Sequence, residues 1–197
     1  MNETTTTQTR LAVADAIGII TAENGRVVDA LRAASDSSLD DAGALLASAP
    51  RVFVLGAGRS GLALKMTAMR LMHLGLDVHV VGEVTSPAIT AGDVLLVASG
   101  SGTTGAIVRA AETAHGVGAS ILALTTAPES PLGRLAAVTV VIPAAAKQDH
   151  AGQVSAQYSG GLFEQSVLLV GDAIFHALWQ ASGATAEQLW PRHANLE

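Results

Sequence analysis

Residues 52–61 read Val52-Phe53-Val54-Leu55-Gly56-Ala57-Gly58-Arg59-Ser60-Gly61, and their pattern indicates the architecture of the whole chain. Four apolar residues, three of them β-branched or aromatic, precede three glycines within six positions. This pattern predicts a strand over 52–55 that runs into a tight turn. Apolar residues then resume near helical spacing, which predicts a helix over about 60–74. Because a glycine-rich turn at a helix N-terminus leaves backbone N–H groups free and aligned, the stretch predicts an anion-binding site.

The rest of the chain repeats this alternation of strand and helix. Apolar runs predict further strands over 78–81, 94–98, 121–124 and 138–142, helices over about 104–116 and 161–182, and a short turn near 132–135. Such strands are typical of a parallel sheet that is covered on both faces, so we expect an α/β fold, a three-layer α-β-α sandwich. Five strands favour the flavodoxin-like order 2-1-3-4-5. Ligands then bind at the carboxyl ends of the first and third strands.

A second glycine-rich loop, Ser99-Gly100-Ser101-Gly102-Thr103-Thr104, follows the third predicted strand. In the expected strand order it would face Gly56–Gly61 across the switch point. Hydroxyls together with free N–H groups form a cradle for a phosphate monoester. Thr103 and Thr104 have an alternative role as ordinary helix N-caps.

The first loop also matches the dinucleotide fingerprint, as Gly56-x-Gly58-x-x-Gly61. Glu83 lies about where a ribose-binding acid would stand. Against this alternative, Arg59 and Ser60 place specific phosphate donors within the turn, and the hydroxyl-rich second loop is not part of the fingerprint. A chain of 197 residues also leaves little room for a separate substrate domain. At this point both a sugar phosphate and a dinucleotide fit the first loop.

Composition narrows the possible partners. The net charge is −6, and lysine occurs only at Lys65 and Lys147, so no basic face is expected for nucleic acid or anionic lipid. The chain has no cysteine, which excludes disulfide and thiol chemistry and fits a cytoplasmic protein. No basic-then-apolar leader and no apolar run of about 18 residues is present, so we expect no signal peptide and no membrane span.

We expect one domain over 1–197, made of three parts. Residues 1–50 form a helical arm, with helices over about 10–34 and 39–48, and Ser37 or Ser38 can cap the second. This arm is better suited to packing or assembly than to chemistry. Residues 51–182 form the α/β core, and residues 183–197 form a C-terminal tail.

Two residues outside the loops are candidates for chemistry. Glu164 lies in the first turn of the predicted helix over 161–182, where it is either an N3 capping carboxylate or a general base kept ionised by the helix N-terminus. His193, near the end of the chain, is either a solvated side chain or an acid/base group that titrates near pH 7. The spacing of the other histidines predicts no metal site.

Several segments taken together carry a family resemblance. They are Gly56–Gly61, Met69–Gly75, Gly82-Glu83, Pro87-Ala88-Ile89, Ser99–Gly102, Leu162-Phe163-Glu164-Gln165 and the closing His193-Ala194-Asn195-Leu196-Glu197. In this order, over nearly the whole chain, they resemble the sugar isomerase (SIS) domain family. Within it they resemble the branch that interconverts 3-hexulose 6-phosphate and fructose 6-phosphate. Each segment alone is modest evidence for the family, but the occurrence of all of them in this order is specific to it.

The resemblance implies an isomerase that works through a 2,3-enediol, without metal or cofactor, in the ribulose monophosphate route of formaldehyde fixation. It also implies a homo-tetramer whose active sites are shared between subunits. Two other hypotheses remain: a different SIS phosphosugar isomerase, and an SIS module that only binds a sugar phosphate.

The resemblance also implies residue roles. Glu164 would be the base that moves a proton between C2 and C3, and His193 would act at the sugar oxygens of a neighbouring subunit's site. The phosphate would be held by Gly58, Ser60, Ser99, Ser101, Thr103 and Thr104, with Arg59 supplying positive charge. This chain departs from the family pattern twice: Thr103 replaces a usual glutamate, and Gln157-Tyr158-Ser159 replaces a usual Pro-Met. The first departure adds a hydroxyl to the phosphate loop and removes a charge.

Overall fold

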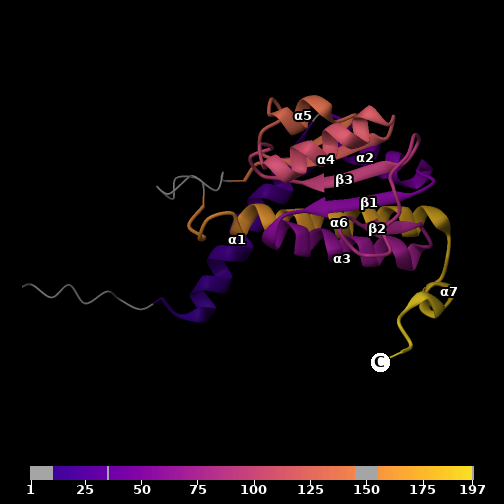
Figure 1. The fold of residues 1–197 in the computed structure, drawn as a ribbon. Helices are drawn as coiled ribbons and strands as arrows, with labels where there is room; N and C mark the ends of the chain where they lie inside the picture. The colour runs from indigo at the N-terminus through magenta and orange to yellow at the C-terminus, as the bar shows by residue number, and fades with distance from the viewer. Residues whose placement is uncertain (1–10, 35, 145–154, 197) are drawn as a thin grey trace, which may run out of the picture.

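A five-stranded parallel sheet forms the centre of the molecule (Figure 1). The computed structural model describes residues 11–34, 36–144 and 155–196. The strands are β1 (Val52–Gly56), β2 (Val78–Val80), β3 (Val94–Ala98), β4 (Ser120–Thr125) and β5 (Val138–Val141). Their order is β2-β1-β3-β4-β5 and every pair is parallel, which confirms the predicted topology.

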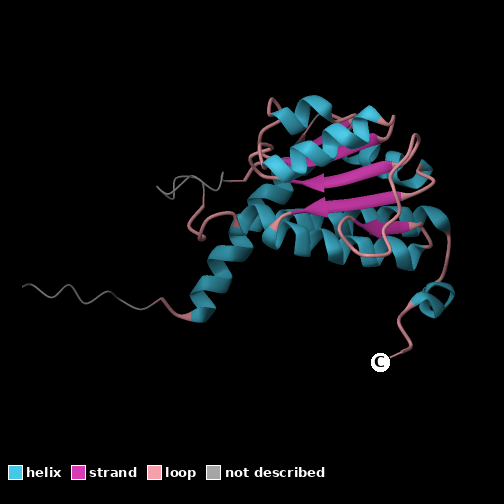
Figure 2. Cartoon of the chain, in the orientation of Figure 1, coloured by secondary structure: helices cyan, strands magenta, loops and turns pink. Residues whose placement is uncertain are grey.

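Helices cover both faces of this sheet, so the predicted three-layer sandwich is confirmed (Figure 2). Because side chains alternate along a strand, Val52 and Val54 of β1 enter one core and Phe53 enters the other. The first core packs against α2 (Ser38–Ser48), α3 (Gly58–Leu74) and α6 (Gly161–Ser182). The second packs against α4 (Gly105–Gly116) and α5 (Pro131–Leu135).

The N-terminal arm begins with α1 (Val13–Ala33), which packs against α6 at one end and extends away from the sheet at the other (Figure 1). Leu11, Val13 and Ile17 are therefore more than half exposed. The predicted cap of the next helix is only partly right. Ser37 is the N-cap of α2, but its hydroxyl donates to Asp41 Oδ2 (2.5 Å) and does not cap a backbone N–H.

Two parts of the fold differ from the sequence prediction. The helix after the first loop starts at Gly58, two residues earlier than expected, so Arg59 and Ser60 lie in its first turn. The tail contains α7 (Ala186–Leu189) and a 3₁₀ turn (Trp190–Arg192), neither of which was predicted. A reciprocal capping box between Thr185 and Gln188 stabilises α7. Its single turn is too short to give a periodic signal.

One helix of the described part, α6, is long and apolar enough to cross a membrane when judged by length and composition alone. Half of its most apolar 18-residue window is buried inside the fold. It packs against α3 and contributes Leu162, Phe163 and Val167 to the first core, as the core helix of a sandwich does. The expectation of no membrane span stays a prediction.

Candidate active site

The two glycine-rich loops lie side by side at the carboxyl ends of β1 and β3, which are neighbours in the sheet. Both line one small cavity of about 40 Å³. Ala57 and Ser60 come from the first loop, and Ser99–Ser101 and Thr104 come from the second. The prediction that the loops face each other is therefore confirmed. We call this space the phosphate-loop cavity.

Glycine is required in both loops for steric reasons. A Cβ on Gly61 would lie 2.4 Å from the carbonyl oxygen of Gly56, so the chain could not turn so tightly into α3. Gly102 has a φ of +60°, and a Cβ there would lie 1.9 Å from Ser130 Oγ. The N-cap of α3 is Ala57, which has no side-chain acceptor, so the first N–H groups of this helix remain available to an anion.

The hydroxyls of the second loop bond to one another across the turn. Ser99 Oγ and Thr104 Oγ1 are 3.2 Å apart, and Thr103 Oγ1 donates to Ser101 Oγ at 3.0 Å. Thr104 is the N-cap residue of α4, but its hydroxyl makes no capping bond, so the alternative of an ordinary side-chain cap is wrong for it. Ser60 and Ser99 are buried, whereas Ser101 and Thr103 are exposed.

Glu164 lies at the start of α6, against the first turn of α3. Its carboxylate is 7% exposed, and its Oε2 is 3.0 Å from Nε of Arg59, a side chain that is 67% exposed. Gly160 is the N-cap of α6, so the N3 position belongs to Phe163 and the N3-cap interpretation of Glu164 is wrong. The ion pair joins the first turns of α3 and α6, which the sequence places more than 100 residues apart.

A second cavity, of about 160 Å³, opens next to this ion pair. We call it the Glu164 cavity. It is lined by Arg59, Leu62, Ala63 and Met66 of α3 and by Glu164, Gln165 and Leu168 of α6. The first turns of α3 thus border both cavities, through Ser60 on one side and Arg59 on the other. The residue that lines the loop cavity and the residue that pairs with the buried carboxylate are therefore adjacent in α3.

His193 lies at the opposite end of the molecule. Its ring stacks on His73 at 3.9 Å and on Trp190 at 4.6 Å. Since α3 rises about 1.5 Å per residue, His73 lies roughly 21 Å along the helix from Arg59. Burial lowers the pKa of His73, and the neighbouring His193 and Arg70 lower it further. Within one chain the structure does not bring His193 and Glu164 together.

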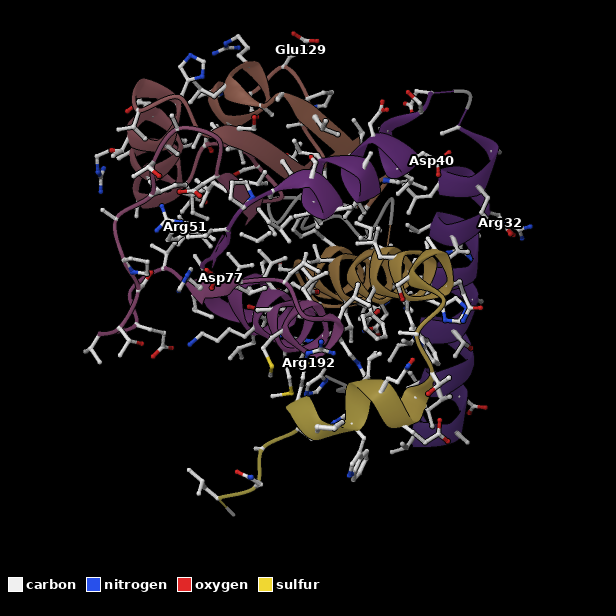
Figure 3. The ribbon with its side chains drawn as sticks, turned by 90° about the vertical axis from the view of Figure 1, so that its right-hand side faces the viewer. Arg32, Asp40, Arg51, Asp77, Glu129 and Arg192 are labelled. Atoms are coloured by element: carbon white, nitrogen blue, oxygen red, sulfur yellow. The ribbon has the colours of Figure 1, made fainter. Side chains whose placement is uncertain are left out.

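Figure 3 looks onto this opposite end, where Arg192 reaches the end of α3. Its Nη1 donates to the carbonyl oxygen of His73 at 3.2 Å. The guanidinium also lies against Gly75, where a Cβ would be only 3.1 Å from it. Arg192 therefore helps to hold the tail at the amino end of the sheet, away from the two cavities.

The acid that the dinucleotide alternative needs is engaged elsewhere. Glu83 forms an ion pair with Lys65 of α3 at 3.0 Å, and both side chains are about half exposed. Glu83 lines neither of the two cavities. Within residues 11–34, 36–144 and 155–196, no group of three or more His, Asp or Glu side chains could hold a metal ion.

The structure also places three residues near the site for which the sequence indicated no role there: Glu23, Gln157 and Gln165. Glu23 of α1 is buried, Gln165 follows Glu164 in the chain, and Gln157 lies seven residues before it. One signal could have found Glu23, because it is an acid on the face of α1 that also carries the buried Val27. No periodicity identifies the two glutamines.

Comparison with known proteins agrees with this geometry. The SIS domain model matches residues 45–162, more than half of the chain. The 3-hexulose-6-phosphate isomerase of Mycobacterium gastri is 61% identical over 147 residues, covering 75% of this chain and 74% of that protein. The protein of the same name from Bacillus subtilis is 38% identical over 164 residues, covering 83% and 89%.

A solved structure supports the fold. It is a hypothetical protein from Methanococcus jannaschii for which a function of 3-hexulose-6-phosphate isomerase is inferred. It superposes with a TM-score of 0.80 at 24% identity, covering 93% of this chain and 99% of the other. At this identity the likeness shows a shared fold. The family match and the closeness to the mycobacterial protein lead to one conclusion: the chain belongs to the SIS domain family, on the branch of the relatives named 3-hexulose-6-phosphate isomerase.

Proposed function

We propose that this chain is an isomerase that interconverts 3-hexulose 6-phosphate and fructose 6-phosphate. The observation that carries the proposal is a buried carboxylate, Glu164, paired with Arg59, whose neighbour Ser60 lines the cavity built from the two glycine-rich loops. The relatives named for this reaction support the choice of substrate. We further propose a cytoplasmic role in the ribulose monophosphate pathway of formaldehyde fixation, which the resemblance implies.

The proposed chemistry moves the carbonyl from C3 to C2. Glu164 removes the proton from C2, and the electrons of that C–H bond form the C2–C3 double bond of an enediol while O3 takes up a proton. The C3 carbon then takes the proton back from Glu164, and O2 loses its hydroxyl proton to become the new carbonyl. One carboxylate on one face of the sugar is enough for both steps.

The phosphate is proposed to bind in the phosphate-loop cavity. Backbone N–H groups at Gly58 and the first turn of α3 would donate to it, together with the hydroxyls of Ser60, Ser99, Ser101, Thr103 and Thr104. Arg59 forms an ion pair with Glu164. We propose that it contacts both the phosphate and the sugar. Most of these donors are neutral N–H and hydroxyl groups. A phosphate monoester can therefore bind through local hydrogen bonds, although the protein as a whole carries a net negative charge.

The proposed assembly is a homo-tetramer with shared sites. An apolar row on α3, made of Leu62, Met66, Met69 and Met72, is exposed and leads into the Glu164 cavity. The free end of α1 presents a second exposed apolar surface. Two separate self-complementary contacts are what a tetramer with dihedral symmetry uses. His193, which is remote from its own Glu164, would then serve a neighbouring copy.

Mixing two inactive variants tests the shared site. Subunits with Glu164→Gln and subunits with His193→Ala should each be inactive or weak alone. After joint unfolding and refolding, hybrid oligomers should recover activity, because one site then has both wild-type groups. If confirmed hybrid oligomers recover no activity, the shared-site proposal is overturned. Sedimentation equilibrium gives the number of copies.

Proton NMR of fructose 6-phosphate in D₂O tests the reaction. The proposed isomerase exchanges the proton at C3, so this signal should disappear. An SIS isomerase that acts between C1 and C2 would exchange a C1 proton, and a binding module would exchange neither. Absence of C3 exchange with active-site binding intact would overturn the proposed function.

A further inference from the structure

A buried carboxylate in the N-terminal arm is connected to the active site by hydrogen bonds. Glu23 of α1 is 4% exposed and accepts three hydrogen bonds from the segment that leads into α6. Ser155 Oγ donates to Oε2 at 2.6 Å, Ala156 N donates to Oε1 at 2.7 Å, and Gln157 Nε2 donates to Oε2 at 3.0 Å. The side chain therefore fixes the chain a few residues before the start of α6.

The connection continues to the wall of the Glu164 cavity. Gln165 Nε2 donates to Gln157 Oε1 at 2.8 Å, and Asn24 Nδ2 donates to Gln165 Oε1 at 2.6 Å. Asn24 is the next residue to Glu23 on α1, so the hydrogen bonds close a ring between α1 and α6. Gln165 follows Glu164 in the chain and lines the same cavity.

Every hydrogen bond in this ring has the same direction. A carboxylate can only accept, so Gln157 must turn its NH₂ group toward Glu23 and its oxygen toward Gln165. Gln165 must then turn its NH₂ group toward Gln157 and its oxygen toward Asn24. Burial raises the pKa of Glu23, but the hydrogen bonds from Ser155, Ala156 and Gln157, together with the charge of Arg26, outweigh it and hold the pKa below its ordinary value. The group is therefore charged at neutral pH.

We propose that Glu23 is a positioning residue of the active site: its negative charge sets the direction of the Gln157–Gln165–Asn24 chain and so the orientation of the Gln165 amide beside Glu164. An amide has two donor protons and two acceptor lone pairs. The ring uses one of each on Gln165, which leaves one donor and one acceptor for sugar hydroxyls in a fixed order. This inference rests on the proposed function, and it gives the arm a part in the chemistry as well as in packing.

The substitution Glu23→Gln tests the role of the charge. The amide side chain has the same shape as the carboxylate but offers an NH₂ group where Oε2 accepted two bonds, so the favoured arrangement reverses Gln157 and then Gln165. We expect kcat for C3 exchange to fall roughly 10- to 100-fold, as misplacement of a reacting group does. The Kd for inorganic phosphate, which is proposed to bind in the other cavity, should stay within about twofold.

A charge relocation distinguishes orientation from stability. In Glu23→Gln/Gln157→Glu, the new carboxylate at position 157 accepts from the new amide at position 23 and from Gln165, so the original direction at Gln165 returns. We expect kcat of the double variant to be at least about fivefold higher than that of Gln157→Glu alone. In the single variant, two carboxylates meet at hydrogen-bond distance. This comparison also holds if Glu23→Gln proves too unstable to purify.

Asp93 provides the matched control. Its carboxylate is also buried and accepts several hydrogen bonds, but it lies at the other end of the sheet. Asp93→Asn should lower the melting temperature and leave kcat unchanged. A folded Glu23→Gln protein with wild-type kcat, or a relocated charge without recovery, would overturn the inference. If wild-type protein shows no C3 exchange at all, the proposed function fails first, so the two failures are distinguishable.

Discussion

Two arginine–carboxylate pairs occupy opposite ends of the sheet, and they differ in how completely they are enclosed. At the amino end, Arg51 approaches Asp93 through Nε at 3.0 Å and Nη2 at 2.6 Å, and Thr90 donates two further bonds. At the carboxyl end, Arg59 approaches Glu164 through Nε at 3.0 Å and stays 67% exposed beside a cavity. The first carboxylate is saturated by donors from its own structure, and the second stands where a ligand can reach it.

This difference separates a structural pair from a reactive one. Removing one partner of an enclosed, buried pair leaves an uncompensated charge and destabilises the fold. The Arg59–Glu164 contact has one largely solvated partner, so we expect it to contribute less to stability than the enclosed pair does. The two pairs therefore predict opposite responses to the same kind of substitution.

The largest effect is expected for Glu164→Gln. Loss of a general base typically costs roughly 10²- to 10⁴-fold in rate, so C3 exchange should fall by about this factor while the melting temperature changes little. NMR exchange and differential scanning calorimetry measure the two quantities. Activity within tenfold of wild type would remove Glu164 from the role of base.

Asp93→Asn should show the opposite pattern, with lower stability and unchanged activity. The Arg51 guanidinium would lose its buried counter-charge, and we expect the free energy of unfolding to fall by about 2 kcal/mol, since Arg51 is partly solvated. Urea unfolding measures the loss. Normal stability would show that the enclosed pair is not structural, and a changed kcat would break its contrast with Glu164.

A smaller effect is expected from the two arginines. Arg59→Gln should raise KM for fructose 6-phosphate about tenfold, because one charge-assisted contact to the phosphate is lost. Arg51→Gln should leave KM unchanged and lower stability instead. Steady-state kinetics on both variants compares them directly, and equal KM values would mean that Arg59 does not contact substrate.

The smallest effect concerns pH. Burial raises the pKa of Asp93, but its bonds from Arg51 and Thr90 outweigh this and hold the pKa below its ordinary value. A carboxyl with a depressed folded-state pKa stabilises the protein above its unfolded pKa, and this stability is lost as the pH falls. Wild-type stability should therefore decline between about pH 5 and pH 3, and Asp93→Asn should decline less steeply. Parallel curves in urea titrations at several pH values would contradict this.

Much of the fold could be predicted from local pattern. The strand over 94–98 was placed at its observed bounds, since five consecutive apolar residues between turns leave few alternatives. The 161–182 helix was also placed correctly, with glycine at both ends. The single-turn α7 was missed, because a segment of four residues has no period to detect.

The candidate site was predictable only in part. The two loops were identified, since glycine spacing and hydroxyl content are local properties and the strand order brings the loops together. Glu164 and His193 were candidates from their side chains and places in the chain, whereas the roles given to them came from the resemblance and stay predictions. Sequence did not predict that His193 stacks on His73, because the contact joins side chains 120 residues apart.

The alternation of elements, the parallel sheet and the paired glycine loops can all be predicted from local spacing within about 20 residues. Which charged side chains form pairs depends on the three-dimensional packing of the helices. Arg59 pairs with Glu164, and Glu23 accepts hydrogen bonds from the segment before α6, because helices that are distant in sequence pack together. Hydrogen-bond direction and burial are properties of these long-range contacts. The pattern along the chain therefore defines where an anion can bind, and the packing defines which carboxylate stands beside it.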